Sequence, residues 1–386
     1  MKRLLLLLVL FSVFNPDSHA CTSAIVASER SSEGVPMLWK HRDSKFDNTR
    51  VEYIAGGKYA YTAIVPNNRR YKTGVFAGIN EKGLGVITTA TRHLPKASSE
   101  EWEACDRKQI KGSLSCRALR ECATIDEFEA MLRDEKRKIG FTSNLGIADA
   151  TGAVAYFEIW DLGYRRYDVG KSGNRGFDVR SNFSHVGDPN KKGASKRRYD
   201  LIMKEMTAHK GDFSPWNLIG YSRSYNSIKY GDVLAMDKRY FCQNHTVPRH
   251  STVGAFVVVC DGDNPRMLVM NGHSASSLAV PVYVKAKQNI PECVHGSTMR
   301  NLSNDFRKKA YRYIDSNHIL LNKEFVRKVL NVRQPKITMP REMPRDIYAF
   351  NARIDKRYIS YEKRLRKLID KEVYPPKKIV AQSDKI

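Results

Sequence analysis

A cysteine at position 21 follows a segment with the pattern of a secretory leader. After a positively charged start, Leu4–Phe14 are apolar apart from one serine, and small residues stand three positions and one position before Cys21, at Ser18 and Ala20. This apolar stretch is too short to span a bilayer, which needs about 20 residues. We therefore predict a signal peptide over residues 1–20, and export to the periplasm or the extracellular space. The mature chain would then begin with Cys21.

A cysteine at the start of a mature chain can be nucleophile and base at once. A thiol attacks as the thiolate, and the pKa of a free cysteine is about 8.5. An α-amino group titrates at about 7.7–8.0 and lies within reach of its own side chain, directly or through one water. Removal of Ala20 would free that amine, so export would also be activation. Such a site needs a cation near the thiolate, a carboxylate near the ammonium and N–H donors for an oxyanion.

Two other interpretations of Cys21 stay open. A lipoprotein signal also places a cysteine at the cut and acylates it, although such signals usually carry an aliphatic residue where this chain has Ser18. Export equally permits Cys21 to form one half of a disulfide. The six other cysteines allow up to three disulfides, although Cys260 ends an apolar strand and is predicted to be buried instead. They are Cys105, Cys116, Cys122, Cys242, Cys260 and Cys293.

The partners of Cys21 must come from neighbouring strands, and the sequence predicts the first of these. Thr22–Ser28 and Val35–His41 have strand patterns and enclose a turn at Ser31–Gly34, which predicts a hairpin. Arg42 and Asp43 follow the second strand, so the hairpin should return them close to Cys21. The alternative is that these two residues only form the polar end of a strand.

The remainder of the chain divides into two parts. Residues 21–284 are rich in strand patterns, with helices predicted from a capping box at Thr124–Glu127, over Ser195–Met206 and after Ser214. Beyond residue 296 glycine disappears, and residues 301–386 hold 22 Lys+Arg against 10 Asp+Glu. We interpret 297–386 as a basic helical C-terminal extension, with helical spacing over Phe350–Ile369. Its basic side is either solvated or a patch for a polyanion.

Composition narrows the class of protein without identifying it. The chain has 386 residues, 41% hydrophobic residues and a formal net charge of +25, which is a globular composition that favours an anionic partner. Almost half of that charge lies in the C-terminal extension, so we do not predict nucleic-acid binding, although the basic tail could contact an envelope surface. The chain has no His-Glu-x-x-His, no Cys-x-x-Cys and no glycine-rich phosphate loop, and we expect neither metal nor cofactor.

Several segments together resemble a known family. They are Cys21-Thr22-Ser23, Leu38–Asp43, Gly78–Val86, Asn144–Gly152, Val179–Phe183 and Ser195–Tyr199. With these segments the chain resembles the N-terminal-nucleophile (Ntn) hydrolases, in the branch of the choloylglycine hydrolases, penicillin V acylases and isopenicillin N acyltransferases. The resemblance runs in order from Cys21 to about Val284 and implies a four-layer αββα sandwich over residues 21–296.

The resemblance implies a role for each candidate catalytic residue. Cys21 would be nucleophile through its sulfur and base through its amine, Arg42 would support the thiolate, and Asn182 would donate its amide N–H to the oxyanion. The second oxyanion donor would be a backbone N–H near Ala90. An arginine at 198, or alternatively at 197, would lie beside the site. Relatives often have aspartate three residues after the first arginine, where this chain has Lys45; Asp43 is assigned that role instead.

The activity implied is cleavage of a linear amide in an N-acyl amino compound such as a bile-salt conjugate, an acyl-amino acid or a penicillin-like amide. Acyl transfer to an amine is possible on the same site. The partner would be a small-molecule substrate, and the sequence does not fix the oligomeric state. Two alternatives stay open: an exported basic binding protein or lipoprotein with a non-catalytic Cys21, and a cysteine dipeptidase of the same nucleophile class.

Overall fold

A computed structural model describes most of the chain from Ala20 onward. The described residues are 20–45, 47–67, 74–96, 98–104, 114–133, 143–161, 163–170, 175–188, 190–236, 240–313 and 318–373. Most of the predicted signal peptide, residues 1–19, lies outside these ranges, as does Cys105. None of the helices within them is long and apolar enough to cross a membrane.

The first sheet contains the hairpin predicted around Cys21. Its six antiparallel strands run in the order β10-β1-β2-β14-β15-β16. The predicted first strand and second strand correspond to β1 and β2, so the local pattern located this hairpin correctly. The strands are β1 (Cys21–Val26), β2 (Met37–Asp43), β10 (Phe177–Arg180), β14 (Thr252–Val259), β15 (Arg266–Asn271) and β16 (Val280–Tyr283).

The second sheet is an antiparallel meander. Its seven strands pair in chain order from β3 to β9, so each strand lies beside the one that precedes it in the sequence. The Asn80–Gly83 turn joins β5 to β6, as its residue types predict. The strands are β3 (Thr49–Ile54), β4 (Tyr61–Pro66), β5 (Ala77–Asn80), β6 (Gly85–Ala90), β7 (Ser143–Ala148), β8 (Val154–Trp160) and β9 (Gly163–Asp168).

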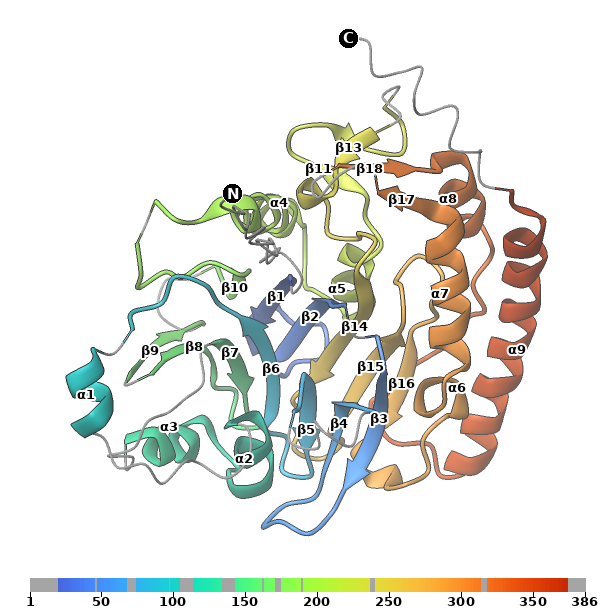
Figure 1. Cartoon of the computed structure of the whole chain (residues 1–386). Helices are drawn as coiled ribbons and strands as arrows, with labels where there is room; N and C mark the ends of the chain where they lie inside the picture. The colour runs from blue at the N-terminus through green and yellow to red at the C-terminus, as the bar shows by residue number, and fades with distance from the viewer. Residues whose placement is uncertain are drawn as a thin grey trace, which may run out of the picture.

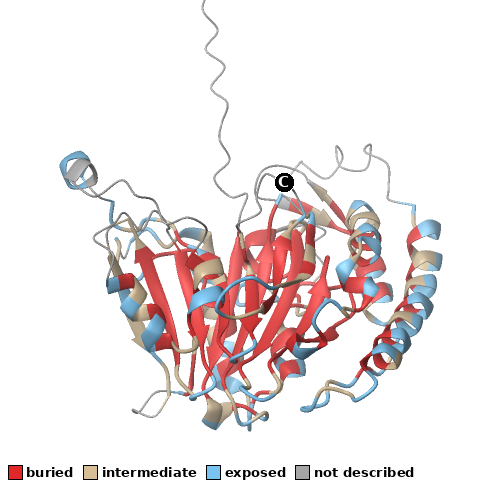
Figure 2. Cartoon of the chain, turned by 90° about the horizontal axis from the view of Figure 1, so that it is seen from below, coloured by how far each residue is buried: buried red, intermediate tan, exposed pale blue. Residues whose placement is uncertain are grey.

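The two sheets pack face to face through one apolar core. Side chains of β1, β2 and β14 meet those of β6, β7 and β8, and Figure 2 shows that buried residues fill the strands of both sheets. Two glycines allow a close approach of the sheets. A Cβ at Gly85 would lie 2.6 Å from the Cys260 sulfur, and one at Gly146 would lie 3.1 Å from Ile25. The alternation of apolar residues along these strands thus buries one face of each sheet against the other.

Helices cover the opposite faces of both sheets. The first sheet packs on α4 (Gly193–Ala208) and α5 (Pro215–Tyr221), and the second on α2 (Leu114–Glu121) and α3 (Ile125–Arg133), as Figure 1 shows. The Thr124 hydroxyl accepts from the backbone N–H of Glu127 at 3.1 Å, so this predicted helix start is present. The short α1 (Ser99–Ala104) precedes these helices. The predicted α+β class is therefore confirmed.

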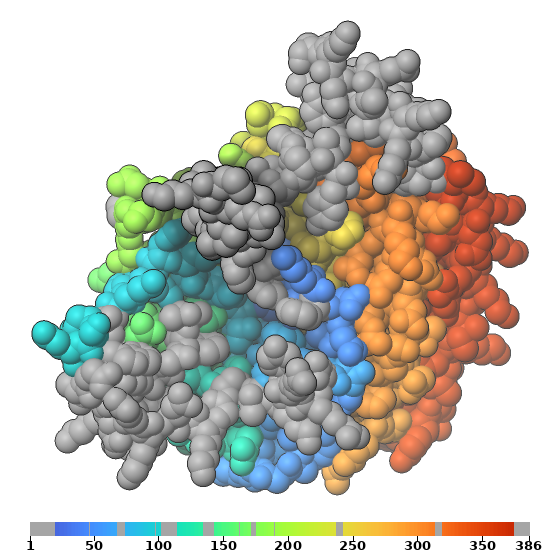
Figure 3. Space-filling view, viewed as in Figure 1, coloured from blue at the N-terminus to red at the C-terminus, as the bar shows by residue number. Residues whose placement is uncertain are grey.

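The C-terminal residues form a helical group that packs against the first sheet and shares its core. The long helix α9 includes the predicted Phe350–Ile369 and buries Tyr361 and Leu365. In Figure 3 this helix and α7 form one side of the surface. Two short strands were not predicted here: β18 pairs with β13 on one side and with β17 on the other. The elements are α6 (Glu292–His295), α7 (Thr298–Ala310), β17 (Tyr311–Tyr313), β18 (His318–Leu321), α8 (Lys323–Leu330), α9 (Ile347–Lys371) and β13 (Tyr240–Cys242).

The close approach of the two sheets at Gly85 predicts a loss of stability on substitution. In Gly85→Ala the new methyl would overlap the Cys260 sulfur and a methyl of Val258, which approach to 2.6 and 2.8 Å. We expect the free energy of unfolding, measured in urea, to fall by about 1–3 kcal/mol. Gly220 in α5 has open space around it, so Gly220→Ala should be neutral or stabilising. Equal stabilities of the two variants would contradict this packing.

Candidate active site

Cys21 is the first residue of β1 and lies opposite Arg42 of β2. In the next pair that shares its face, Ser23 lies opposite Lys40. Because side chains alternate between the faces of a strand, these four side chains all point towards the second sheet. The Ser23 hydroxyl contacts that sheet through Tyr156, at 2.9 Å. The predicted hairpin therefore brings two cations to the side of the sheet that carries the thiol.

The cation nearest the thiol is Lys40, which the sequence prediction missed. Its Nζ lies 3.4 Å from the Cys21 sulfur and also contacts the carbonyl of Thr88. Only 1% of Lys40 is exposed, and this burial lowers the pKa of its ammonium, although the nearby Cys21 opposes the shift. Lys40 stands two residues before Arg42 on the same face of β2, so the period of two of the strand places both cations on the side of the thiol.

Arg42 is the second cation beside the thiol. Its guanidinium lies 3.9 Å from the ring centroid of Phe76, in a cation–π arrangement. Burial lowers the pKa of Arg42 to about 10, while the charges of Cys21 and Asp43 favour the protonated form. The predicted proximity of Arg42 to Cys21 is therefore present in the register of the hairpin.

Asn182 links the backbone of Cys21 to two other predicted residues. Its Oδ1 accepts from the Cys21 backbone nitrogen at 2.7 Å and from Nη2 of Arg198 at 2.8 Å. Because a guanidinium only donates, Arg198 fixes which end of the amide faces Cys21. The Nδ2 of Asn182 donates to the carbonyl of Ala90 at 2.7 Å. The fold thus brings Cys21, Asn182, Ala90 and Arg198 together, whereas the oxyanion roles of Asn182 and Ala90 stay predictions.

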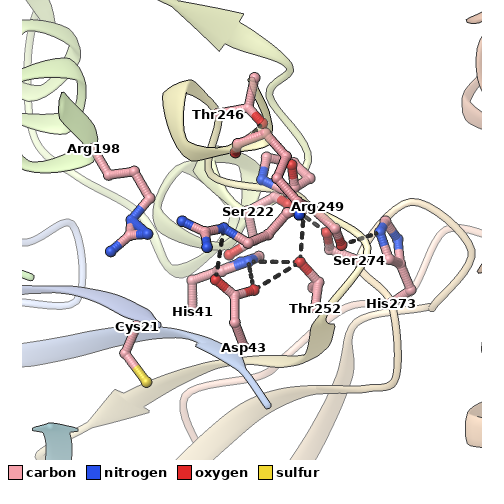
Figure 4. A network of polar contacts seen from close by, with 12 residues as sticks. Cys21, His41, Asp43, Arg198, Ser222, Thr246, Arg249, Thr252, His273 and Ser274 are labelled. Atoms are coloured by element: carbon pink, nitrogen blue, oxygen red, sulfur yellow. Dashed lines mark hydrogen bonds and ion pairs between the residues drawn. The ribbon is translucent and has the colours of Figure 1, made fainter. Parts of the chain in front are cut away.

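Asp43 belongs to a different environment from that of the thiol. Its side chain lies on the other face of β2, where it contacts Arg249 at 3.2 Å and His41 at 3.2 Å and accepts from the Thr252 hydroxyl at 2.9 Å. Figure 4 shows this network, with the Cys21 sulfur pointing away from it. The backbone N–H of Asp43 donates to the carbonyl of Ala20 at 2.8 Å.

The charge on Asp43 is stabilised inside the protein. Burial on its own raises the pKa of this carboxyl, but the positive charge of Arg249 and the hydrogen bond from His41 outweigh burial and lower the pKa below its usual value. Arg249 had no place in the sequence prediction. It lies in the loop before β14, outside any sequence motif. Only its burial beside Asp43 in the folded chain shows that it belongs to this network.

The described cysteines other than Cys21 form no disulfide. These cysteines are Cys116, Cys122, Cys242, Cys260 and Cys293. Cys260 is buried, as its position at the end of an apolar strand predicts. The described part of the chain likewise contains no group of three histidines, cysteines or carboxylates arranged to hold a metal ion.

Comparisons with known proteins give likenesses to solved structures alone. No protein-family model and no curated protein matches the chain. A mutant conjugated bile acid hydrolase from Clostridium perfringens is 11% identical, with a TM-score of 0.43 over 69% of this chain and 93% of that one. An N-acylethanolamine-hydrolyzing acid amidase ortholog from Caenorhabditis elegans is 19% identical, with a TM-score of 0.42 over 61% and 92%.

A penicillin V acylase from Agrobacterium tumefaciens is 16% identical, with a TM-score of 0.44 over 69% of this chain and 86% of that one. These three proteins belong to the superfamily that the motifs of the sequence resemble.

The contact between Lys40 and Cys21 predicts a change in thiol reactivity. In Lys40→Met the Cys21 sulfur loses the cation that contacts it, so the negative charge of the attacking thiolate is less well stabilised. We expect alkylation of Cys21 by iodoacetamide at pH 7, followed by peptide mass spectrometry, to slow by about tenfold. Lys40→Arg keeps the charge and should retain most of the rate. Unchanged alkylation in Lys40→Met would rule out a supporting role for this ammonium.

Proposed function

We propose that this chain is an exported Ntn hydrolase that cleaves a linear amide bond in an N-acyl amino compound. Removal of the leader after Ala20 would make Cys21 the first residue and free its amine. The observation that carries the proposal is the position of Cys21 at the start of β1. There its backbone nitrogen is hydrogen-bonded to Asn182, and its sulfur contacts the ammonium of Lys40. The succession of helices, two facing sheets and helices supports the four-layer αββα assignment.

The first step is attack by the thiolate. The free α-amine accepts the thiol proton, directly or through one water, and the thiolate attacks the amide carbon. Lys40 and Arg42 stabilise the negative sulfur before attack. The carbonyl oxygen then becomes an oxyanion, for which the proposal assigns the Asn182 amide and a backbone N–H near Ala90. Since Nδ2 of Asn182 now donates to the Ala90 carbonyl, it must exchange that acceptor for the oxyanion.

The second half of the reaction returns the enzyme to its starting state. The α-ammonium donates its proton to the leaving nitrogen, the C–N bond breaks, and a thioester with Cys21 remains. Water then attacks the thioester with the α-amine as base, which releases the acid and restores the thiol. An amine in place of that water would give acyl transfer. Arg198 donates a hydrogen bond to Asn182, and Asn182 in turn accepts one from the nitrogen of Cys21. Arg198 therefore positions the hydrogen-bond partner of the amine.

Replacement of the nucleophile is the direct test of this proposal. Cys21→Ser should reduce hydrolysis of a panel of acyl amides to the uncatalysed rate, because a serine hydroxyl is a far weaker nucleophile with this amine as base. The circular dichroism spectrum and melting temperature should not change. The panel should include acyl-amino acids, a penicillin-like amide and dipeptides, so that an acylase and a dipeptidase are distinguished. Equal turnover by both proteins would refute the proposal.

The role of the amine predicts the effect of one additional residue. A chain that starts at Ala20 keeps the peptide bond to Cys21 and therefore has no amine at this position. We expect its kcat on any substrate of the panel to be at least about 10²-fold lower than that of a chain starting at Cys21. Full activity of the longer chain would show that another group is the base. Intact mass of the exported protein tests the cut itself, and a lipid adduct on Cys21 would exclude the catalytic role proposed for this residue.

A further inference from the structure

We propose that Cys21 and Lys40 are a covalent modification site, at which a peroxide oxidant joins the sulfur of the cysteine to the side-chain nitrogen of the lysine. The product is a sulfenamide, in which sulfur is bonded directly to nitrogen. Formation of this bond requires only the contact between the two side chains. Its consequence for catalysis, the reversible loss of the nucleophile, rests on the proposed hydrolase.

The two atoms to be joined are already in contact. Nζ of Lys40 lies 3.4 Å from the sulfur of Cys21, although 19 residues separate them in the sequence. In the pairing of β1 with β2, Lys40 lies opposite Ser23 and therefore diagonally across from Cys21. Diagonal neighbours on one face of a sheet are within reach of long side chains. The flexible four-carbon chain of lysine can close the remaining distance by bond rotation.

The surroundings of Lys40 favour a neutral amine once the sulfur has lost its charge. The side chain lies between the two sheets, where it also donates to the carbonyl of Thr88 on β6. This acceptor is neutral, and the contacts of Lys40 with the described residues include no carboxylate. A buried ammonium is costly without a negative partner, whereas a buried amine needs none. The negative sulfur of Cys21 is therefore the partner that keeps this nitrogen charged.

Oxidation itself removes that partner. Burial lowers the pKa of the Lys40 ammonium and the charge of Arg42 lowers it further, while the charge and hydrogen bond of Cys21 raise it. A sulfenic acid is neutral, so oxidation of the thiolate ends the opposing effect of Cys21. Burial and Arg42 then act against only the smaller effect of Asp43, and the pKa of Lys40 falls. The neutral amine that results is a nucleophile, which the ammonium is not.

The reaction proceeds in two balanced steps. The thiolate of Cys21 attacks one oxygen of hydrogen peroxide, the O–O bond breaks, and the other oxygen leaves as hydroxide and takes up a proton to form water. Sulfur is oxidised to the sulfenic acid and the peroxide is reduced. The amine of Lys40 then attacks this sulfur, the S–O bond breaks, and the hydroxyl leaves as water with a proton from the attacking nitrogen.

A thiol reductant reverses the modification. One thiol molecule attacks the sulfur of Cys21, the S–N bond breaks, and the nitrogen of Lys40 takes up the proton of that thiol. A second molecule attacks the mixed disulfide, which releases the thiol of Cys21 and leaves the reductant as its own disulfide.

Other partners for the oxidised sulfur are disfavoured by geometry. A bond to the amine of Cys21 itself would close a strained four-membered ring. The backbone N–H of Thr22 is engaged in the β-ladder, because the hydrogen bond from the Asp43 N–H to the Ala20 carbonyl makes every second pair a hydrogen-bonded one. Arg42, with a pKa of about 10, stays a guanidinium cation and is no nucleophile at neutral pH. Lys40 is therefore the nitrogen that we assign to the bond.

The bond would inactivate the site and also preserve it. Peroxide oxidises a sulfenic acid further to a sulfinic acid, which thiols do not reduce. In the sulfenamide the hydroxyl has gone and the sulfur has no thiolate character, so this further oxidation is slowed. The same bond removes both the nucleophile and the ammonium beside it. The chemistry thus predicts a state that is inactive under oxidant and recoverable by thiols.

The direct test is the mass of one pair of peptides. A chain that starts at Cys21 is treated with hydrogen peroxide, the excess is destroyed with catalase, and the protein is digested with trypsin without reductant. We expect the peptides Cys21–Arg30 and Ser31–Arg42 to be joined, with a mass two hydrogen atoms below their sum and with fragments that locate the bond at Lys40. Dithiothreitol should separate them. The same treatment in urea should give no joined peptide, since the contact requires the folded chain.

Two matched variants separate the amine of Lys40 from its charge. Lys40→Arg keeps a cation but has no amine, so Cys21 should proceed to the sulfinic acid. After peroxide and then dithiothreitol, we expect at least about tenfold less free Cys21 thiol in this variant than in the unchanged protein. Lys45→Arg alters an exposed lysine five residues further on and should change neither the joined peptide nor the recovery. Melting temperatures show whether each variant folds.

The outcomes distinguish this inference from the proposed function, because detection of the bond needs no turnover. Sulfinic acid at Cys21 without joined peptides in the folded, unchanged protein would overturn the modification site and leave the hydrolase intact. Equal recovery of the thiol in a folded Lys40→Arg protein would do the same. Joined peptides from a chain that cleaves no amide of the panel would support the modification site and refute the proposed function.

Discussion

The antiparallel pairing of β1 with β2 is the constraint on which the candidate site depends. The register that sets Cys21 opposite Arg42 also sets Ser23 opposite Lys40, and side chains alternate between the two faces. The thiol and both cations therefore share one face, while Asp43 lies on the other. A slip of one residue in this register would move the thiol and the cations to opposite faces of the sheet. The apolar residues of β1 and β2 prevent such a slip because they must stay in the core, and they therefore also determine which side chains surround the thiol.

The end of β2 is held from its other side by β14. The register of this pair shifts between Thr252 and Gly254, so Thr252 lies opposite Asp43 while Gly254 lies opposite Arg42. Because of this irregularity the Thr252 hydroxyl donates a hydrogen bond to the Asp43 carboxylate. It also positions the loop before β14 so that Arg249 forms an ion pair with the same carboxylate. One end of one strand thus separates two charged environments, a cationic one around the thiol and a mixed one around the carboxylate.

Local elements were predictable from the sequence, and contacts distant in the chain were not. The hairpin that pairs Cys21 with Arg42 follows from strand patterns separated by a turn. Asn182 lies 161 residues from Cys21, and only the resemblance to a family indicated it. Lys40 was hidden because it stands inside a predicted apolar strand, although the period of two places it on the face of Arg42. Arg249 belongs to no pattern, since its importance comes from burial, which a sequence does not display.

The same distinction explains why the net charge of the chain says little about its candidate site. Much of the excess lies in the C-terminal residues, where α9 packs through its apolar side and half-buried arginines such as Arg366 pair with Asp305 and Glu362. Such charges act through water and are screened within about 8–10 Å. Arg198 and Arg249 are two charges among 66 Lys+Arg, yet both are buried, Arg198 against Asn182 and Arg249 against Asp43, where screening is weak. The place of a charge therefore says more about the candidate site than the sum of all charges does.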